Sequence, residues 1–240
     1  MELTLLHFFP DRLNLYGDRG NILVLKKRCE WRNIKLNIKK ITGVDGIQSH
    51  LNGADILFIG GGSDREQSIV TLQLHKIKKE FQAMVEDGVA ALTICGGYQF
   101  LGSYYELSNG LKLKGLEVLD FYTLSKPTRL IGNLLMETKD MGTIVGFENH
   151  VGRTYHEYES FGTVISGFGN NGEDAKEGLR YKNLIGTYLH GPLLPKNPTV
   201  ADWLLEVALK RKYGSIALEP LNDNLENLAK QFIWEHRQRN

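Results

Sequence analysis

Residues 89–102 read VAALTICGGYQFLG. The apolar run from Val89 to Ile94 predicts a buried strand, and the glycine pair after Cys95 predicts a sharp turn into a helix. Cys95 lies at this corner, where the backbone is often strained and the glycine neighbours leave room for a substrate. The helix would direct free N–H groups at the sulfur, which favours the thiolate. This geometry suits a nucleophile, whereas a buried structural cysteine is the alternative interpretation.

The composition limits the kind of protein this can be. The chain has 240 residues, with 29 Lys and Arg against 28 Asp and Glu. Its length suits one large domain, and its balanced charge gives no reason to expect nucleic acid or an anionic membrane as partner. The two cysteines, Cys29 and Cys95, offer neither a disulfide framework nor metal-ligand spacing, which favours a reducing compartment and predicts no metal site. No apolar run approaches the length of a membrane span, so we expect a cytoplasmic protein without membrane insertion.

Strands and helices alternate along much of the chain. Apolar runs at 3–8, 54–59 and 184–189 predict strands, and the segment from Arg65 to Asp87 has a mostly amphipathic helical pattern. Between Gly102 and Gly178 the runs are shorter, which predicts a more antiparallel or irregular region. The alternation predicts an α/β fold, with a mainly parallel sheet flanked by helices.

The last part of the chain, from about residue 199 to residue 240, is expected to be helical. Apolar residues recur there at helical spacing, first at Trp203, Leu204 and Val207, and then at Leu225, Leu228 and Phe232. Such a pattern is typical of a helix that buries one face. We therefore expect both helices to cover the core of a single domain that spans residues 1–240.

Two glycine-rich loops follow predicted strands. Gly60-Gly61-Gly62 lets several backbone N–H groups converge on one point, so the loop could hold an anion or an oxyanion, or be a plain loop. Its spacing matches neither a P-loop nor a dinucleotide fingerprint, which disfavours nucleotide binding. Near the N-terminus, Asp18 follows Gly17 at the start of a predicted helix. Capping of that helix is the favoured role for Asp18, and direct binding is the alternative.

His190 follows the predicted strand at 184–189. The carboxyl ends of parallel strands share one edge of a sheet, where open α/β proteins place their sites, so His190 and Cys95 can meet there. A thiolate and an imidazole are the minimum for covalent acyl transfer. Taken alone, His190 also fits a loop or core histidine, and the pairing with Cys95 favours catalysis.

Four blocks of sequence occur in an order that resembles the class I glutamine amidotransferases. The blocks are Gly60-Gly61-Gly62, Ile94-Cys95-Gly96-Gly97-Tyr98-Gln99, Gly146-Phe147-Glu148-Asn149-His150-Val151-Gly152-Arg153-Thr154 and Tyr188-Leu189-His190-Gly191-Pro192. Together they are most similar to the cobyric acid synthase-like branch. This resemblance implies a flavodoxin-like α/β fold and the hydrolysis of glutamine to glutamate and ammonia.

The resemblance also implies roles for individual residues. Cys95 would attack the side-chain amide of glutamine, and His190 would act as general base and acid. The N–H groups of Gly96 and Gly61 would hold the oxyanion. Arg129 would bind the substrate carboxylate, which a guanidinium can grip with two hydrogen bonds. Gln99 would face the bound substrate, or only orient the turn.

The sequence departs from the family at one position. Class I enzymes usually complete the catalytic triad with a Glu two residues after the His, and that position is Pro192 here. Either a Cys95–His190 dyad suffices, or a carboxylate comes from another chain.

An implied partner completes the expected reaction. Amide synthesis from a carboxylate needs activation by ATP, and no segment here resembles an ATP site. The resemblance implies a heterodimer with a Mur-ligase-like synthetase subunit, which would bind ATP and Mg²⁺ and amidate the D-glutamate of lipid II to D-isoglutamine in peptidoglycan synthesis. The alternatives are a glutaminase that serves a corrinoid-amidating synthetase, a cysteine amidase for γ-glutamyl peptides, and a non-catalytic interaction subunit.

Overall fold

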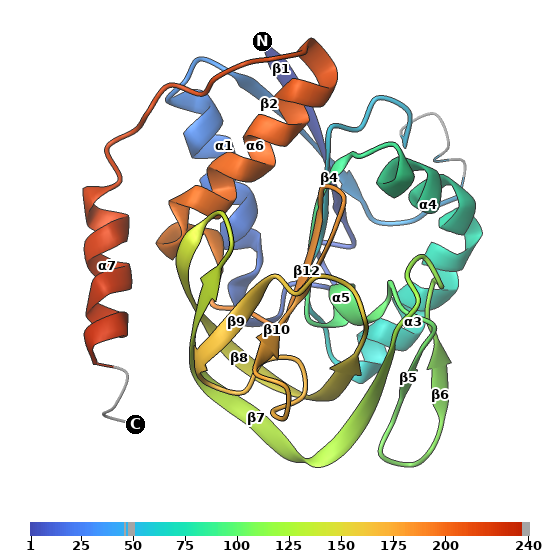
Figure 1. Cartoon of the computed structure of the whole chain (residues 1–240). Helices are drawn as coiled ribbons and strands as arrows, with labels where there is room; N and C mark the ends of the chain where they lie inside the picture. Colours follow the sequence, from blue (N-terminus) through green and yellow to red (C-terminus); the bar gives the residue numbers. More distant parts are fainter. Residues whose placement is uncertain (46, 48–50, 237–240) are drawn as a thin grey trace.

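A computed structural model describes residues 1–45, 47 and 51–236 of the chain. Its central sheet has six strands in the order β11-β12-β4-β3-β1-β2, and neighbouring strands are parallel except for β11 against β12. The strands are β1 (Glu2–Phe8), β2 (Lys35–Ile41), β3 (Ile56–Ile59), β4 (Ala90–Ile94), β11 (Leu179–Tyr181) and β12 (Leu184–Thr187). Every residue of β3, β4 and β12 is buried, as expected for parallel strands covered on both faces. The predicted α/β fold is confirmed (Figure 1).

Helices cover this sheet. They are α1 (Arg19–Glu30), α3 (Asp64–Leu74), α4 (Lys78–Glu86), α5 (Gly96–Gln99) and α6 (Pro198–Tyr213), and short 3-10 turns lie at Leu15–Gly17, His75–Ile77 and Leu194–Lys196. The helical pattern predicted from Arg65 to Asp87 is present as two helices, because the turn at His75–Ile77 separates α3 from α4. Ile77 has φ −119° and ψ 18°, outside the helical range, and its side chain is fully buried.

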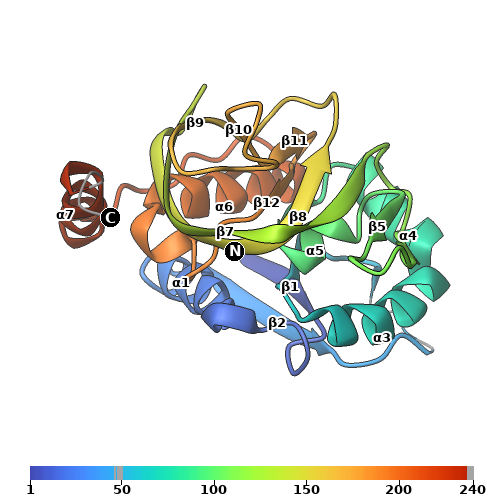
Figure 2. The ribbon, with the colours of Figure 1, turned by 90° about the horizontal axis from the view of Figure 1, so that it is seen from below.

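A second sheet fills the region between α5 and β11. It consists of β5 (Tyr104–Glu106), β6 (Lys112–Lys114), β7 (Tyr122–Thr138), β8 (Gly142–Tyr155), β9 (Gly162–Ser166) and β10 (Lys176–Glu177). The long strands β7 and β8 are antiparallel, with a register shift between Ser125 and Leu130. In Figures 1 and 2 they curve past the end of the central sheet where α5 begins. This ribbon supplies a wall to the site described below.

The last helix, α7 (Asn224–Glu235), does not cover the core. None of its residues is buried, and Leu225, Leu228 and Phe232 are 79%, 61% and 64% exposed. Figure 1 shows α7 as a separate rod beside the body of the domain. The expectation that these apolar residues pack into the core is therefore wrong for this helix.

A buried arginine ties the chain before α7 to the first helix. Arg28 of α1 is 2% exposed and bonds the carboxylates of Asp202 in α6 and Asp223, directly before α7, at 2.5–3.0 Å. Arg32 bonds Asp202 as well and also donates to the carbonyl of Glu219. Because each guanidinium is paired, its burial is compensated. Among the described residues, no helix has the length and apolar character needed to cross a membrane.

Candidate active site

Cys95 occupies the corner between β4 and α5. Its φ of 50° and ψ of −105° are sparsely populated for a residue with a side chain. Backbone hydrogen bonds hold it there, from its N–H to the carbonyl of Thr187 and from the N–H of Gln99 to its own carbonyl, at 2.8 and 2.9 Å. The tight turn needs glycine at Gly97, because a Cβ there would lie 2.6 Å from the carbonyl oxygen of Ile59. The strained corner predicted for Cys95 is present.

His190 follows β12, the strand next to β4 in the sheet. Its backbone N–H donates to the carbonyl of Phe147 in β8 at 2.7 Å, and its side chain is fully buried. Tyr16, in the turn at Leu15–Gly17, lies edge-on to the imidazole with ring centroids 5.0 Å apart. The His190 backbone is thus tied to β8, and its ring packs against the turn at Leu15–Gly17.

Asp18 places a carboxylate beside His190, although Pro192 takes the usual position of the Glu in the chain. It is fully buried, and its Oδ1 lies 3.2 Å from Nδ1 of His190. Its Oδ2 accepts a hydrogen bond from the N–H of Gly61 at 2.7 Å. The favoured capping role is wrong, because the Asp18 side chain makes no capping hydrogen bond to α1. Neither a bare dyad nor a carboxylate from another chain is needed to orient His190.

The charges around His190 favour its protonated form. Burial alone lowers the pKa of His190, but the thiolate of Cys95 and the hydrogen bond to Asp18 outweigh burial and raise this pKa to about 10. The Nε2 atom makes no hydrogen bond to any described group. A ring oriented through Nδ1, with Nε2 free of other partners and Cys95 near enough to raise the pKa of the ring, has the arrangement of a general base in covalent catalysis.

Gly61 lies where these three side chains meet. A Cβ on Gly61 would lie 2.7 Å from Cε1 of His190, 3.2 Å from Cβ of Cys95 and 3.3 Å from Oδ2 of Asp18. Only glycine leaves this space free. The N–H of Gly61, which was predicted to hold the oxyanion, donates to Oδ2 of Asp18 instead. Gly62 lines the cavity beside Cys95, and its N–H makes no hydrogen bond to a described group.

A cavity of about 240 Å³ opens in front of Cys95. Its walls come from the two sheets and the loops at their edges, and it is lined by Leu15, Tyr16, Gly62, Ser63, Asp64, Gln67, Cys95, Gln99, Tyr105, Arg129, Asn149, His150, Val151 and Gly152. The structure therefore brings Arg129 and Gln99, two residues predicted to bind substrate, to the cavity that contains the predicted nucleophile.

Arg129 and Gln99 differ in how they are held. Arg129, on β7, is exposed and donates to Oδ1 of Asn149 at 2.9 Å. Gln99 is 4% exposed; its Nε2 donates to the hydroxyl of Tyr188 at 3.0 Å, whereas its Oε1 has no partner among the described groups. A buried acceptor without a partner at a cavity wall is available to a ligand donor.

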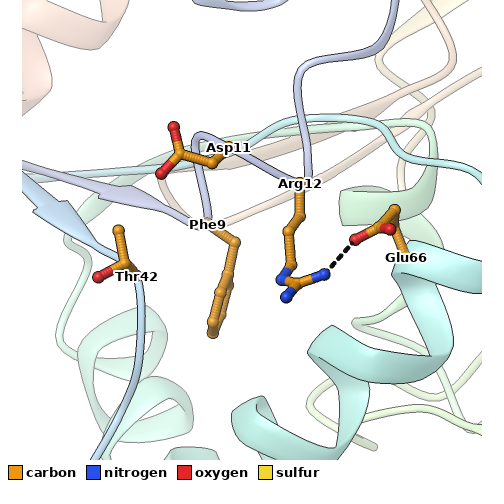
Figure 3. Close-up of a pocket in the computed structure, with 5 residues that line it drawn as sticks. All are labelled: Phe9, Asp11, Arg12, Thr42 and Glu66. Atoms are coloured by element: carbon orange, nitrogen blue, oxygen red, sulfur yellow. Dashed lines mark hydrogen bonds and ion pairs between the residues drawn. The ribbon is translucent and has the colours of Figure 1, made fainter.

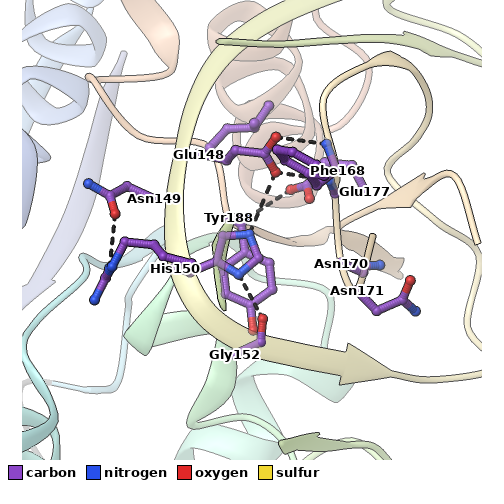
Figure 4. A network of polar contacts seen from close by, with 12 residues as sticks. Glu148, Asn149, His150, Gly152, Phe168, Asn170, Asn171, Glu177 and Tyr188 are labelled. Carbon is purple, nitrogen blue, oxygen red and sulfur yellow. Dashed lines mark hydrogen bonds and ion pairs between the residues drawn. The ribbon is translucent and has the colours of Figure 1, made fainter. Parts of the chain in front are cut away.

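A polar network backs this wall (Figure 4). His150 stacks on Tyr188 with ring centroids 3.7 Å apart, and its Nδ1 donates to the carbonyl of Gly152 at 2.8 Å. Burial lowers the pKa of His150, so the ring is neutral at pH 7. Glu148 accepts from the N–H groups of Phe168 and Gly169 at 2.7 and 2.9 Å, which anchors β8 to the loop after β9. These contacts hold β8 against the neighbouring elements, while Oε1 of Gln99 and Nε2 of His150 are left without a hydrogen-bond partner among the described groups.

A second, more open cavity of about 410 Å³ lies beside the same edge of the sheet, lined by Phe9, Asp11, Arg12, Thr42 and Glu66. Figure 3 shows the ion pair between Arg12 and Glu66, whose atoms are 2.7 Å apart. Neither a cysteine nor a histidine lines it. Within the described residues, no group of three or more His, Cys, Asp or Glu side chains could hold a metal ion. The Cys95 cavity is therefore the candidate active site.

Comparison with known proteins identifies the family of this chain. Residues 4–198 match the CobB/CobQ-like glutamine amidotransferase domain. The chain is 52% identical to lipid II isoglutaminyl synthase (glutamine-hydrolyzing) subunit GatD of Staphylococcus aureus, over 99% of this chain and 97% of that protein. It is 38% identical to the subunit of the same name from Streptococcus pneumoniae, over 96% and 90%.

More distant matches fit the same family. A probable cobyric acid synthase of Methanoregula boonei is 31% identical over 68% of this chain and 34% of that protein. A solved glutamine amidotransferase structure aligns with a TM-score of 0.57 at 17% identity, over 85% of this chain and 98% of that one, which supports the fold. The chain belongs to the CobB/CobQ-like glutamine amidotransferase family.

Proposed function

We propose that this chain is the glutamine-hydrolysing subunit of a lipid II isoglutaminyl synthase. The names of the two similar subunits, each matched over nearly its full length, support this role. The main structural support for this chemistry is the arrangement of three side chains at one edge of the sheet: Cys95, His190 near it, and Asp18 bonded to His190. A cavity lies in front of the Cys95 sulfur.

The first half of the reaction forms a thioester. The Cys95 thiolate adds to the amide carbon of the glutamine side chain, and the carbonyl oxygen becomes an oxyanion. The N–H groups of Gly96 and Gly62 hold this oxyanion, each contributing about 3 kcal/mol to the transition state. The C–N bond then breaks as the Nε2–H of the His190 imidazolium protonates the leaving nitrogen, which departs as ammonia.

The second half restores the enzyme. His190, now neutral, accepts a proton from water through Nε2 while the water oxygen attacks the thioester carbon. The C–S bond breaks, glutamate leaves and the thiolate and imidazolium are regenerated. Asp18 holds the ring through Nδ1 throughout, so that Nε2 faces the reacting atoms. Arg129 binds the α-carboxylate, and Gln99 offers its free Oε1 to a substrate N–H group.

The ammonia is consumed by another subunit. We propose a Mur-ligase-like partner of the MurT type, joined to this chain as a cytoplasmic heterodimer, which binds ATP and Mg²⁺ and amidates the α-carboxylate of D-glutamate in lipid II. The exposed apolar residues Leu225, Leu228 and Phe232 on α7 support a partner, because such a surface is stabilised by burial.

The proposal is tested by intact-mass analysis with the electrophilic glutamine analogue 6-diazo-5-oxo-L-norleucine. We expect one adduct on the wild-type chain, none on Cys95→Ser, and protection of the wild type by L-glutamine. Ammonia release from glutamine, with the partner subunit present, should fall to background in Cys95→Ser. Labelling at Cys29 instead, or no competition by glutamine, would refute glutamine hydrolysis at this site.

A further inference from the structure

The walls of the Cys95 cavity contain two opposite charges. Among the residues that line it, Arg129 is the only Arg or Lys and Asp64 is the only carboxylate. They come from different parts of the fold, Arg129 from β7 and Asp64 from the first position of α3. The cavity therefore presents a cation and an anion to whatever lies in front of Cys95.

The helix does not need the Asp64 carboxylate as a cap. Ser63 fills that role, since its Oγ accepts from the N–H of Glu66 at 3.4 Å. Within the described part of the chain, the Asp64 carboxylate has no hydrogen bond or ion pair, whereas Glu66, two residues later, pairs with Arg12 at 2.7 Å. Asp64 is exposed, so its charge is available to a ligand.

Tyr105 is influenced by both charged groups. This tyrosine of β5 lines the cavity and is 4% exposed. Burial raises the pKa of Tyr105 to about 12, the Asp64 charge adds to the increase and Arg129 opposes it. The neutral phenol thus lies within the electrostatic reach of both charged groups. Asp64, Arg129 and Tyr105 all line the same cavity.

We propose that Asp64 binds the α-ammonium group of glutamine, opposite the carboxylate site at Arg129. This inference rests on the proposed glutaminase function and names the chemical class of the substrate: a free amino acid with both α-groups charged. A glutamine residue inside a peptide has neither charge, so the pair excludes it. The site then hydrolyses free glutamine and spares amides that are part of a peptide.

The test compares two reagents that differ only in the α-amine. They are 6-diazo-5-oxo-L-norleucine and its counterpart without the amine, 6-diazo-5-oxohexanoate. Rates of Cys95 alkylation are measured by mass spectrometry on the full chain with the partner subunit present, for wild type, Asp64→Asn and Glu66→Gln. Glu66→Gln is the matched control, because it removes the same charge two residues away, outside the Cys95 cavity.

We expect the wild type and Glu66→Gln to prefer the amine-bearing reagent by about 10-fold or more. Asp64→Asn should reduce this preference to about 3-fold or less, chiefly by slowing the amine-bearing reagent. An Asp64→Asn variant that keeps the wild-type preference, or slows both reagents equally, would overturn the inference and leave the glutaminase assignment intact. If neither reagent modifies Cys95 of the wild type, the proposed function itself fails.

Discussion

Asp18 and His190 lie 172 positions apart in the chain, yet Oδ1 of Asp18 is 3.2 Å from Nδ1 of the buried imidazole. The other carboxylate oxygen accepts from the N–H of Gly61. One short side chain thus orients the His190 ring and fixes the glycine loop at the same time. This double use requires two acceptor atoms, which an ionised Asp has and an amide lacks.

Asp18→Asn should lower kcat for glutamine hydrolysis by about 10²- to 10⁴-fold. The amide can accept from only one of its two former donors, so either His190 or Gly61 loses its partner. Loss of the Asp18 charge also lowers the pKa of His190, so the alkaline limb of the pH profile of kcat should move to lower pH. Asp11→Asn, an exposed change on the same loop, is the control. A kcat within 2-fold of wild type, with an unchanged profile, would contradict this role.

Gly61→Ala should abolish most activity, by more than about 100-fold, with a smaller effect on folding. The added methyl group would lie 2.7 Å from Cε1 of His190 and 3.2 Å from Cβ of Cys95, so the ring and the sulfur must move apart. Gly43→Ala is the matched control, because a Cβ there meets nothing within 4 Å. The measurements are kcat/KM for glutamine and the melting temperature. Equal activity of the two variants would disprove the crowding argument.

Glu177→Gln should stabilise the protein at alkaline pH. Burial raises the pKa of Glu177 from 4.5 to about 7, although Thr187 and the N–H of Tyr188 bond one of its oxygens. Because its pKa is raised, the folded protein binds this proton more tightly than the unfolded chain does. The resulting gain in the free energy of unfolding is complete below pH 4.5 and is lost as the pH rises through 7. The wild type should therefore lose on the order of 3 kcal/mol between pH 4.5 and pH 8, a loss that the amide avoids.

Thermal melts at pH 5 and pH 8 check this prediction. The variant should melt several degrees higher than the wild type at pH 8, by about 5 °C, and show a flatter pH dependence. Glu173→Gln, on an exposed turn nearby, should follow the wild type. A Glu177→Gln variant whose melting temperature falls with pH as steeply as that of the wild type would show that another group titrates.

Phe232→Ser on α7 should weaken binding of the partner subunit by about 10-fold or more, because an exposed aromatic residue is a frequent anchor of an interface. Alkylation of Cys95 by the glutamine analogue in the isolated chain should not change, since α7 contributes nothing to the cavity. Leu72→Ser, on the 71% exposed Leu72 of α3, is the control. Affinity can be measured by calorimetry. Wild-type affinity of Phe232→Ser would place the interface elsewhere.

Local sequence predicted the fold, and it predicted that Cys95 and His190 follow neighbouring strands at one edge of the sheet, because these signals are short. The apolar run before Cys95 and the strand before His190 determine strand ends, and parallel strands bring those ends to one edge. The helical split at His75–Ile77 and the exposed position of α7 were missed, since periodicity indicates an apolar face without showing what covers it.

Asp18 was missed for a different reason. Its local context, a glycine followed by an acidic residue at a helix start, is typical of a cap, and the competing contact with His190 depends on β1 lying two strands from β4. A usable signal was present, however. The loop after β1 must emerge at the same edge as Cys95 and His190, so a buried carboxylate on it was a candidate as soon as Pro192 replaced the usual Glu.

The paired burial of Arg28 has a consequence for handling the molecule. The guanidinium of Arg28 bonds both Asp202 and Asp223. The segment after α6 therefore supplies one of the two carboxylates that compensate this buried charge on α1. Trimming the chain after α6 would leave an enclosed cation with half of its counter-ions, whereas an affinity tag appended beyond α7 leaves them all in place. A deletion that removes Asp223 together with α7 is therefore expected to destabilise α1 as well.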